Sequence, residues 1–92
     1  MLIGVPKEIK VHEYRVGLVP AGVRELVTNG HQVIVETNAG AGIGMNDADY
    51  EAAGAEIVSA AKEVFERAEM VVKVKEPLES EYAQLRKGQV LF

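Results

Sequence analysis

Five short apolar runs recur along the chain, at residues 2–5, 33–35, 57–58, 70–74 and 90–92. The run at 57–58 is the weakest. Within the runs, apolar residues are mostly continuous rather than alternating with polar ones. This pattern predicts strands that are covered on both faces, as in a parallel sheet.

The segments between these runs have the spacing of amphipathic helices. After Pro20, apolar residues at Val23, Leu26 and Val27 lie on one helical face, and the pair at 29–30 (Asn-Gly) gives a C-terminal stop. Proline suits the first turn because its missing N–H would have no partner there. We therefore expect the first helix to begin at Pro20.

Three more helices are expected. The second starts after Asn46 or Asp47, either of which can cap it, with the negative charge of Asp49 in its first turn and a stop at Gly54. The third runs from about Ser59, a good N-cap residue, and its apolar face is Ala61, Val64, Phe65 and Ala68. A short fourth helix follows Pro77, with Leu78, Tyr82 and Leu85 facing inward, and closes at Gly88.

Alternation of strands and helices predicts an α/β fold with an open, mostly parallel sheet, right-handed crossovers and flanking helices. A length of 92 residues allows one small domain. A folded domain seldom ends on an apolar strand, so we expect this sheet to be incomplete and the chain to be the front part of a longer polypeptide.

Composition excludes several functions. The chain has 10 Lys and Arg against 14 Asp and Glu, a formal net charge of −4, and no basic cluster, which argues against a nucleic-acid partner. The absence of cysteine excludes a disulfide scaffold, a thiolate zinc site and a cysteine nucleophile, and fits a reducing compartment. The first residues do not resemble a signal peptide, and no apolar run approaches the ~18 residues that span a bilayer. We expect a cytoplasmic protein.

A glycine-rich loop at residues 40–44 follows the second strand but does not fit a dinucleotide site. Its glycines form G-x-G-x-G, whereas the dinucleotide fingerprint is G-x-G-x-x-G. The helix that follows also starts too late to direct its N–H groups at a pyrophosphate. We therefore expect a turn-rich loop and no cofactor-binding residue.

No metal site is expected. The acids and amide at 46–51 lack the pattern of a calcium loop, and helix capping explains them better. His12 and His31 are isolated and have no paired ligand at a zinc spacing. His31 is expected to be a solvated turn residue, whereas the role of His12, close to Arg15, stays open.

Arg15 and Lys75 are the candidates for binding chemistry. Arg15 lies in or just after the loop that leaves the carboxyl end of the first strand, and Lys75 comes at the carboxyl end of the fourth, before Pro77. Ligands of open α/β sheets bind outside these strand ends. Arginine binds a carboxylate through two hydrogen bonds, and lysine supplies a point charge for a carbonyl oxygen. Together the two side chains could orient a small 2-oxo acid.

A structural interpretation is also open. Arg15 could pair with Glu8 or Glu13, and Lys75 with Glu76 or Glu79. Lys73 is unusual within a buried strand. A substrate role for Lys73 stays open, but the favoured interpretation is that it extends its amine to solvent or pairs with an acid next to the sheet.

Long motifs in this chain resemble the N-terminal signature that alanine dehydrogenases share with proton-translocating nicotinamide nucleotide transhydrogenases. The motifs cover the whole chain in order: GVPKEIK at 4–10, EYRV at 13–16, PAGV at 20–23, DADY at 47–50, AGA at 53–55, VKVKEP at 72–77 and GQVLF at 88–92. The family usually has Asn at His12, Ala at Gly17 and Ser or Thr at Val19. Without a hydroxyl at Val19, the helix at Pro20 lacks its expected cap.

The resemblance implies a Rossmann-like or flavodoxin-like substrate domain, of which residues 1–92 are the N-terminal part. It implies reversible, NAD-dependent oxidation of L-alanine to pyruvate and ammonia by a homo-oligomer, commonly a hexamer. Arg15 matches the family arginine that binds the substrate carboxylate, and Lys75 the lysine that contacts the substrate. The family's catalytic histidine would lie beyond Phe92, and the NAD-binding domain would be absent from this chain.

Three alternatives stay open. The chain could belong to the NAD(H)-binding subunit of a membrane transhydrogenase, which handles no amino acid. It could belong to a reductase that acts on a larger amino-acid adduct such as saccharopine, although the spacing through Arg15 favours alanine dehydrogenase. Alone, it could be an inactive fragment with an exposed sheet edge.

Overall fold

The computed structural model describes residues 1–8, 16–73 and 90–91. Its elements follow the order β1 (Leu2–Val5), α1 (Pro20–Thr28), β2 (Gln32–Glu36), the 3₁₀ turn η1 (Ala41–Ile43), α2 (Asp47–Ala52), β3 (Glu56–Val58), α3 (Ala61–Arg67), β4 (Met70–Val71) and β5 (Val90–Leu91). The helix expected after Pro77 lies outside the described residues. No helix in the described part of the chain is long and apolar enough to cross a membrane.

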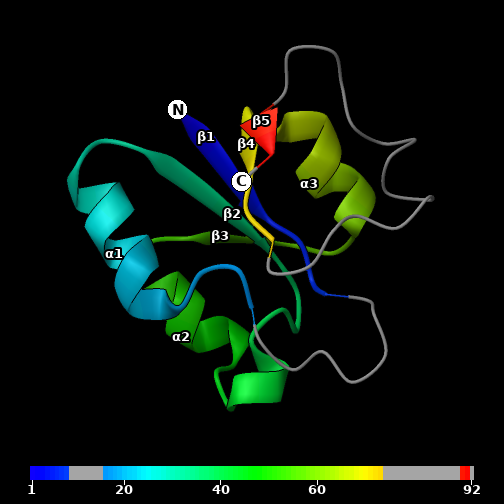
Figure 1. Ribbon diagram of the computed structural model, residues 1–92. Coiled ribbons are helices and arrows are strands. Elements are labelled where there is room, and N and C mark those ends of the chain that lie inside the picture. Colours follow the sequence, from blue (N-terminus) through cyan, green and yellow to red (C-terminus); the bar gives the residue numbers. More distant parts are fainter. Residues whose placement is uncertain (9–15, 74–89, 92) are drawn as a thin grey trace.

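The strands form one parallel sheet in the order β3-β2-β1-β4-β5, which confirms the predicted α/β class (Figure 1). The chain moves outward from β1 through β2 to β3, and then returns to the other side of β1 to add β4. Of the two expected topologies, this order is the Rossmann-like one. The strand order therefore reverses between β1 and β4.

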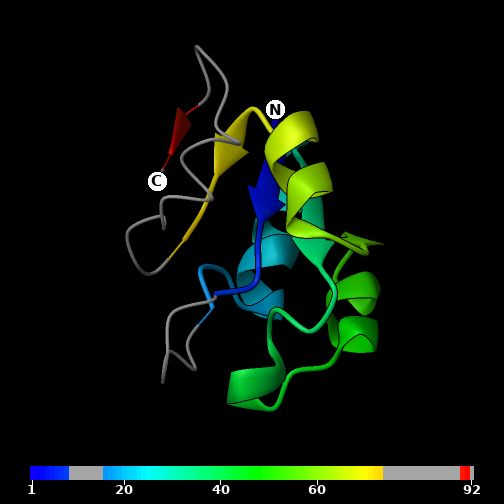
Figure 2. The same cartoon turned by 90° about the vertical axis from the view of Figure 1, so that its right-hand side faces the viewer.

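Helices cover both faces of the sheet, as the continuous apolar runs predict. Ile3, Val5, Val33 and Val35 belong to one core cluster, which also contains Val23 of α1 and Tyr50 of α2. On the opposite face, Ile34 packs with Val58 and with Val64 of α3. Figure 2 shows α3 on one side of the sheet and the other two helices on the far side. Successive residues of a strand point to opposite faces, so both sets are buried.

Close packing of α3 on the central strand depends on Gly4. A Cβ atom at this position would lie 2.7 Å from the Cβ of Ala68 and 2.7 Å from a methyl of Val64. Phe65, Ala68 and Val71 continue this contact toward β4. The lack of a side chain at Gly4 thus lets the end of α3 lie directly on β1 and lead into β4.

The fourth strand is shorter than expected. Its ladder with β1 pairs Ile3 with Met70 and Gly4 with Val71, and the Val72 N–H still donates to the Gly4 carbonyl at 2.9 Å. In this register Pro6 would face Lys73, and proline has no N–H to donate. Lys73 therefore lies just beyond the strand rather than within it.

The helix starts agree with the sequence in two cases out of three. Pro20 begins α1, and Asn46 caps α2 in a reciprocal capping box with Asp49. The expected cap of α3 by Ser59 is wrong, because Ala60 is the N-cap residue and its side chain offers no acceptor. Burial of Val64 and Phe65 fixes the register of this helix more strongly than a cap does.

Val19 has the geometry of an N-cap without a capping group. Its backbone is extended (φ −87°, ψ 162°), and no side chain accepts from the first turn of α1. We predict that Val19→Ser raises the free energy of unfolding by about 1 kcal/mol, because the hydroxyl accepts from that turn. Urea denaturation measures the change. Val19→Ala is the control, since it removes the exposed valine without adding a cap, and equal stability of the two variants would contradict the prediction.

Candidate functional site

The point where the strand order reverses lies between β1 and β4, and in sheets of this topology ligands bind there, outside the carboxyl ends of the strands. The chain leaves β1 toward Arg15 and leaves β4 toward Lys75. Both side chains lie outside the described residues, as does His12. Glu8 and Lys73, which end the described stretches before them, and Val16, which follows Arg15, are described, and their contacts bring the two segments together.

The exit of β1 is held from both sides. Pro6 is buried, and the Lys7 N–H donates to Oε1 of Glu36, at the end of β2, at 2.8 Å. Glu8 then turns its side chain inward, where it is only 3% exposed. Glu36 was not among the residues singled out from the sequence, although an acid directly after the apolar run of β2 is a signal for such a contact.

Glu8 pairs with Lys73. The distance from Oε1 of Glu8 to Nζ of Lys73 is 3.4 Å, and each side chain is 3% exposed. This confirms the interpretation in which Lys73 pairs with an acid next to the sheet. It also engages one of the two acids considered as structural partners of Arg15. The carboxyl ends of β1 and β4 are thus joined by a buried ion pair.

The segment that follows Arg15 packs against the exit of β4. Val16 and Val72 are buried in the same core cluster. A Cβ atom at Gly17 would lie 2.5 Å from the Val72 carbonyl oxygen, so the two backbones approach more closely than a side chain allows. Glycine at this position therefore permits a close contact between the two segments that carry Arg15 and Lys75.

Tyr50 of α2 holds the next residue of that segment. Its side chain is buried, and its hydroxyl donates to the Leu18 carbonyl at 2.9 Å. Burial, with a smaller effect of Asp49, raises the pKa of Tyr50, so the hydroxyl stays protonated and can donate. The sequence analysis assigned this tyrosine no such role.

Asp47 shapes the loop that leaves β2. Its carboxylate accepts from the Thr37 hydroxyl at 2.5 Å and from the Asn38 N–H at 2.9 Å. Asn38 has a positive φ of 65°, and the hydrogen bond from its N–H to Asp47 stabilises this turn. The two hydrogen bonds, that from Thr37 first, lower the pKa of Asp47.

The glycine-rich loop forms a turn that closes on itself. Ala41–Ile43 is a 3₁₀ turn, Gly44 takes a left-handed conformation, and Asn46 then caps α2. This confirms helix capping as the role of Asn46 and Asp49, whereas the Asp47 carboxylate binds the preceding turn at Thr37 and Asn38. A capped helix start in this position does not fit a pyrophosphate.

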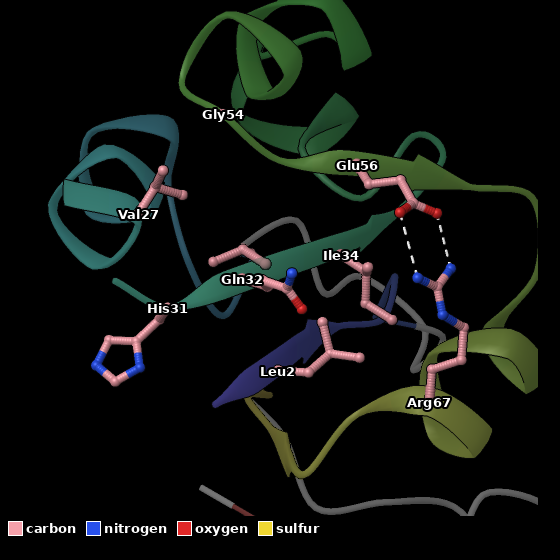
Figure 3. Close-up of a pocket in the computed structure, with 9 residues that line it drawn as sticks. Leu2, Val27, His31, Gln32, Ile34, Gly54, Glu56 and Arg67 are labelled. Atoms are coloured by element: carbon pink, nitrogen blue, oxygen red, sulfur yellow. Dashed lines mark hydrogen bonds and ion pairs between the residues drawn. The ribbon is translucent and has the colours of Figure 1, made fainter. Parts of the chain in front are cut away.

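A cavity of about 290 Å³ lies at the opposite edge of the sheet (Figure 3). Leu2, Gln32 and Glu56, the first residues of β1, β2 and β3, line it together with Val27, His31, Val33, Ile34, Gly54 and Arg67. His31, expected to be a solvated turn residue, is partly exposed here, and its Nδ1 lies 3.5 Å from the N-terminal amine. The cavity lies at the amino ends of the strands and is thus remote from the carboxyl ends of β1 and β4.

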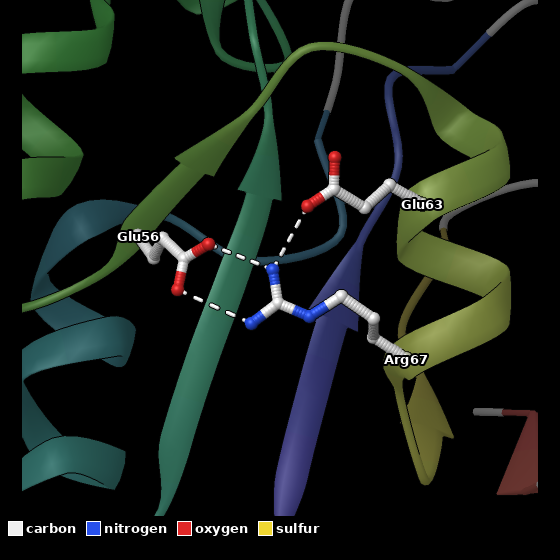
Figure 4. A network of polar contacts seen from close by, with 3 residues as sticks. All are labelled: Glu56, Glu63 and Arg67. Carbon is white, nitrogen blue, oxygen red and sulfur yellow. Dashed lines mark hydrogen bonds and ion pairs between the residues drawn. The ribbon is translucent and has the colours of Figure 1, made fainter.

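The arginine of this cavity is engaged by two acids (Figure 4). Arg67 binds both carboxylate oxygens of Glu56, at 2.7 and 3.2 Å, and one of Glu63 at 2.9 Å. The hydrogen bonds raise the pKa of Arg67 and lower that of Glu56. This network joins α3 to β3 and leaves the guanidinium poorly suited to an anionic ligand. Across residues 1–8, 16–73 and 90–91, no group of three His, Cys, Asp or Glu could hold a metal ion.

Comparison with known proteins identifies relatives for the whole chain. The family model described as "Alanine dehydrogenase/PNT, N-terminal domain" matches residues 4–92. Alanine dehydrogenase of Bacillus subtilis is 60% identical over 92 residues, and that of Mycolicibacterium smegmatis is 55% identical over the same length. These matches cover 100% of this chain and 24% and 25% of the relatives.

Solved structures of the same family also match this chain. An L-alanine dehydrogenase matches 99% of this chain with a TM-score of 0.95 and 58% identity, and a transhydrogenase from Sinorhizobium meliloti matches 99% with a TM-score of 0.91 and 33% identity. The chain covers 25% and 26% of these structures. It spans about a quarter of the length of the relatives that it matches.

We predict that the contribution of Asp47 to stability depends on pH. Because folding lowers its pKa, the ionised carboxylate stabilises the fold above the unfolded-state value of about 3.9, and this stabilisation is lost as the pH falls through the folded-state value. Asp47→Asn should lower the free energy of unfolding by about 1 kcal/mol at pH 7, and the difference from the parent protein should shrink below pH ~4. Urea denaturation across pH measures it. Glu51→Gln, an exposed acid on the same helix, is the control, and a pH-independent difference for Asp47→Asn would contradict the prediction.

We predict that Tyr50→Phe loosens the segment at 16–19. The variant keeps the buried ring and removes only the hydroxyl that donates to Leu18, so the free energy of unfolding should fall by about 1 kcal/mol. Amide hydrogen exchange at residues 17–19 should become faster, while exchange in β2 should follow only the change in global stability. Unchanged exchange at 17–19 would show that the hydrogen bond does not hold this segment.

Proposed function

Given that the chain belongs to the alanine dehydrogenase/PNT family, through the N-terminal domain, we propose that it is part of the substrate domain of an NAD-dependent L-alanine dehydrogenase. The reaction is the reversible oxidative deamination of L-alanine by NAD and water to pyruvate, ammonia and NADH. The names of the relatives at 55–60% identity support this reaction over others of the family. Residues 1–92 would supply the N-terminal part of the domain that binds the amino acid.

The observation that carries the proposal is the convergence of two segments at the reversal of strand order. Gly17 lies against the Val72 carbonyl, and Glu8 pairs with Lys73. Arg15 is two residues from Gly17, and Lys75 is two residues from Lys73. Since a residue spans at most about 3.6 Å of chain, both cations are tethered near one edge of the sheet.

In this proposal Arg15 binds the carboxylate of alanine or pyruvate. Its planar guanidinium offers two parallel N–H donors and stays charged at any relevant pH. Lys75 contacts the substrate oxygen or carboxylate through its compact ammonium group. Two cations also favour pyruvate, an anion, over a neutral ketone of the same size.

NAD would accept the hydride from the α-carbon of alanine. We place its site in a further domain of a longer polypeptide, as the relatives' fourfold greater length suggests. The catalytic histidine that the resemblance implies would also lie beyond Phe92. From the same resemblance, we propose that the full-length protein is cytoplasmic and forms a homo-oligomer, commonly a hexamer in this family.

The second candidate is the NAD(H)-binding subunit of a transhydrogenase. The match to the transhydrogenase of Sinorhizobium meliloti, at a TM-score of 0.91, favours it because the same fold serves both proteins. Its 33% identity is well below the 58% of the L-alanine dehydrogenase structure. Such a subunit would exchange hydride between nucleotides and would need no amino acid.

We predict that the full-length protein that carries this chain reduces NAD in the presence of L-alanine. Arg15→Ala should raise the KM for L-alanine and for pyruvate by about 100-fold or more, because two charge-assisted hydrogen bonds to the carboxylate are lost. Arg24→Ala is the control. Arg24 is an exposed arginine on α1 that donates to the Ala52 carbonyl at 3.4 Å, and its loss should leave KM unchanged.

Absorbance at the NADH band follows both directions of the reaction. Unchanged KM in an active Arg15→Ala variant would exclude the carboxylate role. A folded protein that binds NADH, ignores L-alanine and transfers hydride to an NADP analogue with a membrane partner would instead establish the transhydrogenase.

A further inference from the structure

We propose that Glu8 and Lys73 form a positioning pair, which sets the separation of the two segments that carry the substrate-binding cations. The inference rests on the proposed function, because it assigns a purpose to a contact beside that site. Neither residue is assigned a role by the resemblance or by the comparisons.

The burial of both charged side chains supports this role. Each side chain is 3% exposed, although glutamate and lysine are rarely buried, and the charged atoms lie 3.4 Å apart. A buried ion pair adds little net stability, because removing two charges from water offsets most of their attraction. Apolar residues of similar volume would hold the two strands together as well, so stability alone does not account for these charges.

The ion pair also fixes the relative position of the two strand exits. Apolar contacts tolerate sliding, whereas an ion pair in a low-dielectric interior holds two specific atoms together. Glu8 comes three residues after the end of β1, and Lys73 two residues after the end of β4, so the pair joins the two strand exits. The hydrogen bond from the Lys7 N–H to Glu36 fixes the same exit relative to β2.

The position of the pair relative to the backbone ladder also supports this role. Among the described residues, the ladder of β1 with β4 extends to the hydrogen bond from the Val72 N–H, and Pro6 has no N–H to donate to β4. The Glu8–Lys73 pair lies just after this last described hydrogen bond and joins the last described residues before Arg15 and Lys75.

The test uses the full-length protein and a double-mutant cycle. Glu8→Gln and Lys73→Met keep the side-chain volume and remove the charge, singly and together. Lys62→Met, Glu66→Gln and their combination form the control cycle, since that pair has the same chemistry on α3 but is exposed, at 3.8 Å. KM for L-alanine, KM for NAD, kcat and the melting temperature are measured for each variant.

We expect each single variant at the buried pair to raise the KM for L-alanine at least tenfold, because displacement by about 1 Å can cost on the order of 100-fold. KM for NAD should stay within twofold of the parent. The double variant should be no worse than the worse single variant, because the two residues act as one unit. The control cycle should leave both KM values unchanged.

If a single variant does not fold, because one buried charge has lost the opposite charge of this pair, the double variant still decides. It removes both charges of the pair, and we expect its KM for L-alanine to be raised about tenfold. Parent-like KM for L-alanine in a folded double variant would overturn the inference, as would an equal rise in KM for NAD. Independent, multiplying effects of the two single changes would also overturn it and would indicate that Lys73 contacts substrate itself. An inactive parent protein would instead refute the proposed function.

Discussion

Parallel pairing of β1 with β4 is the constraint on which the site depends. It joins the start of the chain to a segment almost seventy residues later, with Ile3 opposite Met70 and Gly4 opposite Val71. Without it, the exits of these strands would have no fixed relation. Gly4 permits this arrangement because the absence of a side chain lets α3 lie on β1 and deliver the chain to β4. A single small residue at the centre of the sheet thus governs the approach of two distant segments.

The contacts that complete the site are polar and are placed where the backbone ladder ends. Glu8 and Lys73 join the exits of β1 and β4, Lys7 and Glu36 join those of β1 and β2, and the Tyr50 hydroxyl holds Leu18. Each contact links elements that lie far apart in sequence. At the amino ends of the strands, the network of Arg67 with Glu56 and Glu63 stabilises the packing of α3 and lies away from the carboxyl ends of β1 and β4. The contacts at the carboxyl ends therefore align the segments that carry the candidate binding residues, whereas those at the amino ends stabilise the fold.

The sequence predicted the fold well because its signals are local. Continuous Val and Ile runs gave the strands and their double coverage, Pro20 gave the start of α1, and Asn46 with Asp49 gave the cap of α2. The prediction that Ser59 caps α3 was wrong. The burial of Val64 and Phe65 sets the register of this helix and outweighs the preference of serine for the N-cap. The early end of β4 is explained by Pro6, the residue that follows β1, and so could not be deduced from the run at 70–74 alone.

The site was predictable only in part, for a related reason. Strand polarity predicts that Arg15 and Lys75 lie at the same end of the strands of a parallel sheet, but the contacts around them depend on the three-dimensional structure. The pairing of Lys73 with Glu8, the anchoring of Leu18 by Tyr50 and the contact of Gly17 with Val72 each join segments that sequence spacing does not relate. The most direct test is a crystal structure of the full-length protein with NADH and pyruvate. The account predicts that Arg15 and Lys75 both lie within about 3.2 Å of one pyruvate molecule at the carboxyl ends of β1 and β4. Pyruvate bound elsewhere, or bound by neither cation, would contradict it.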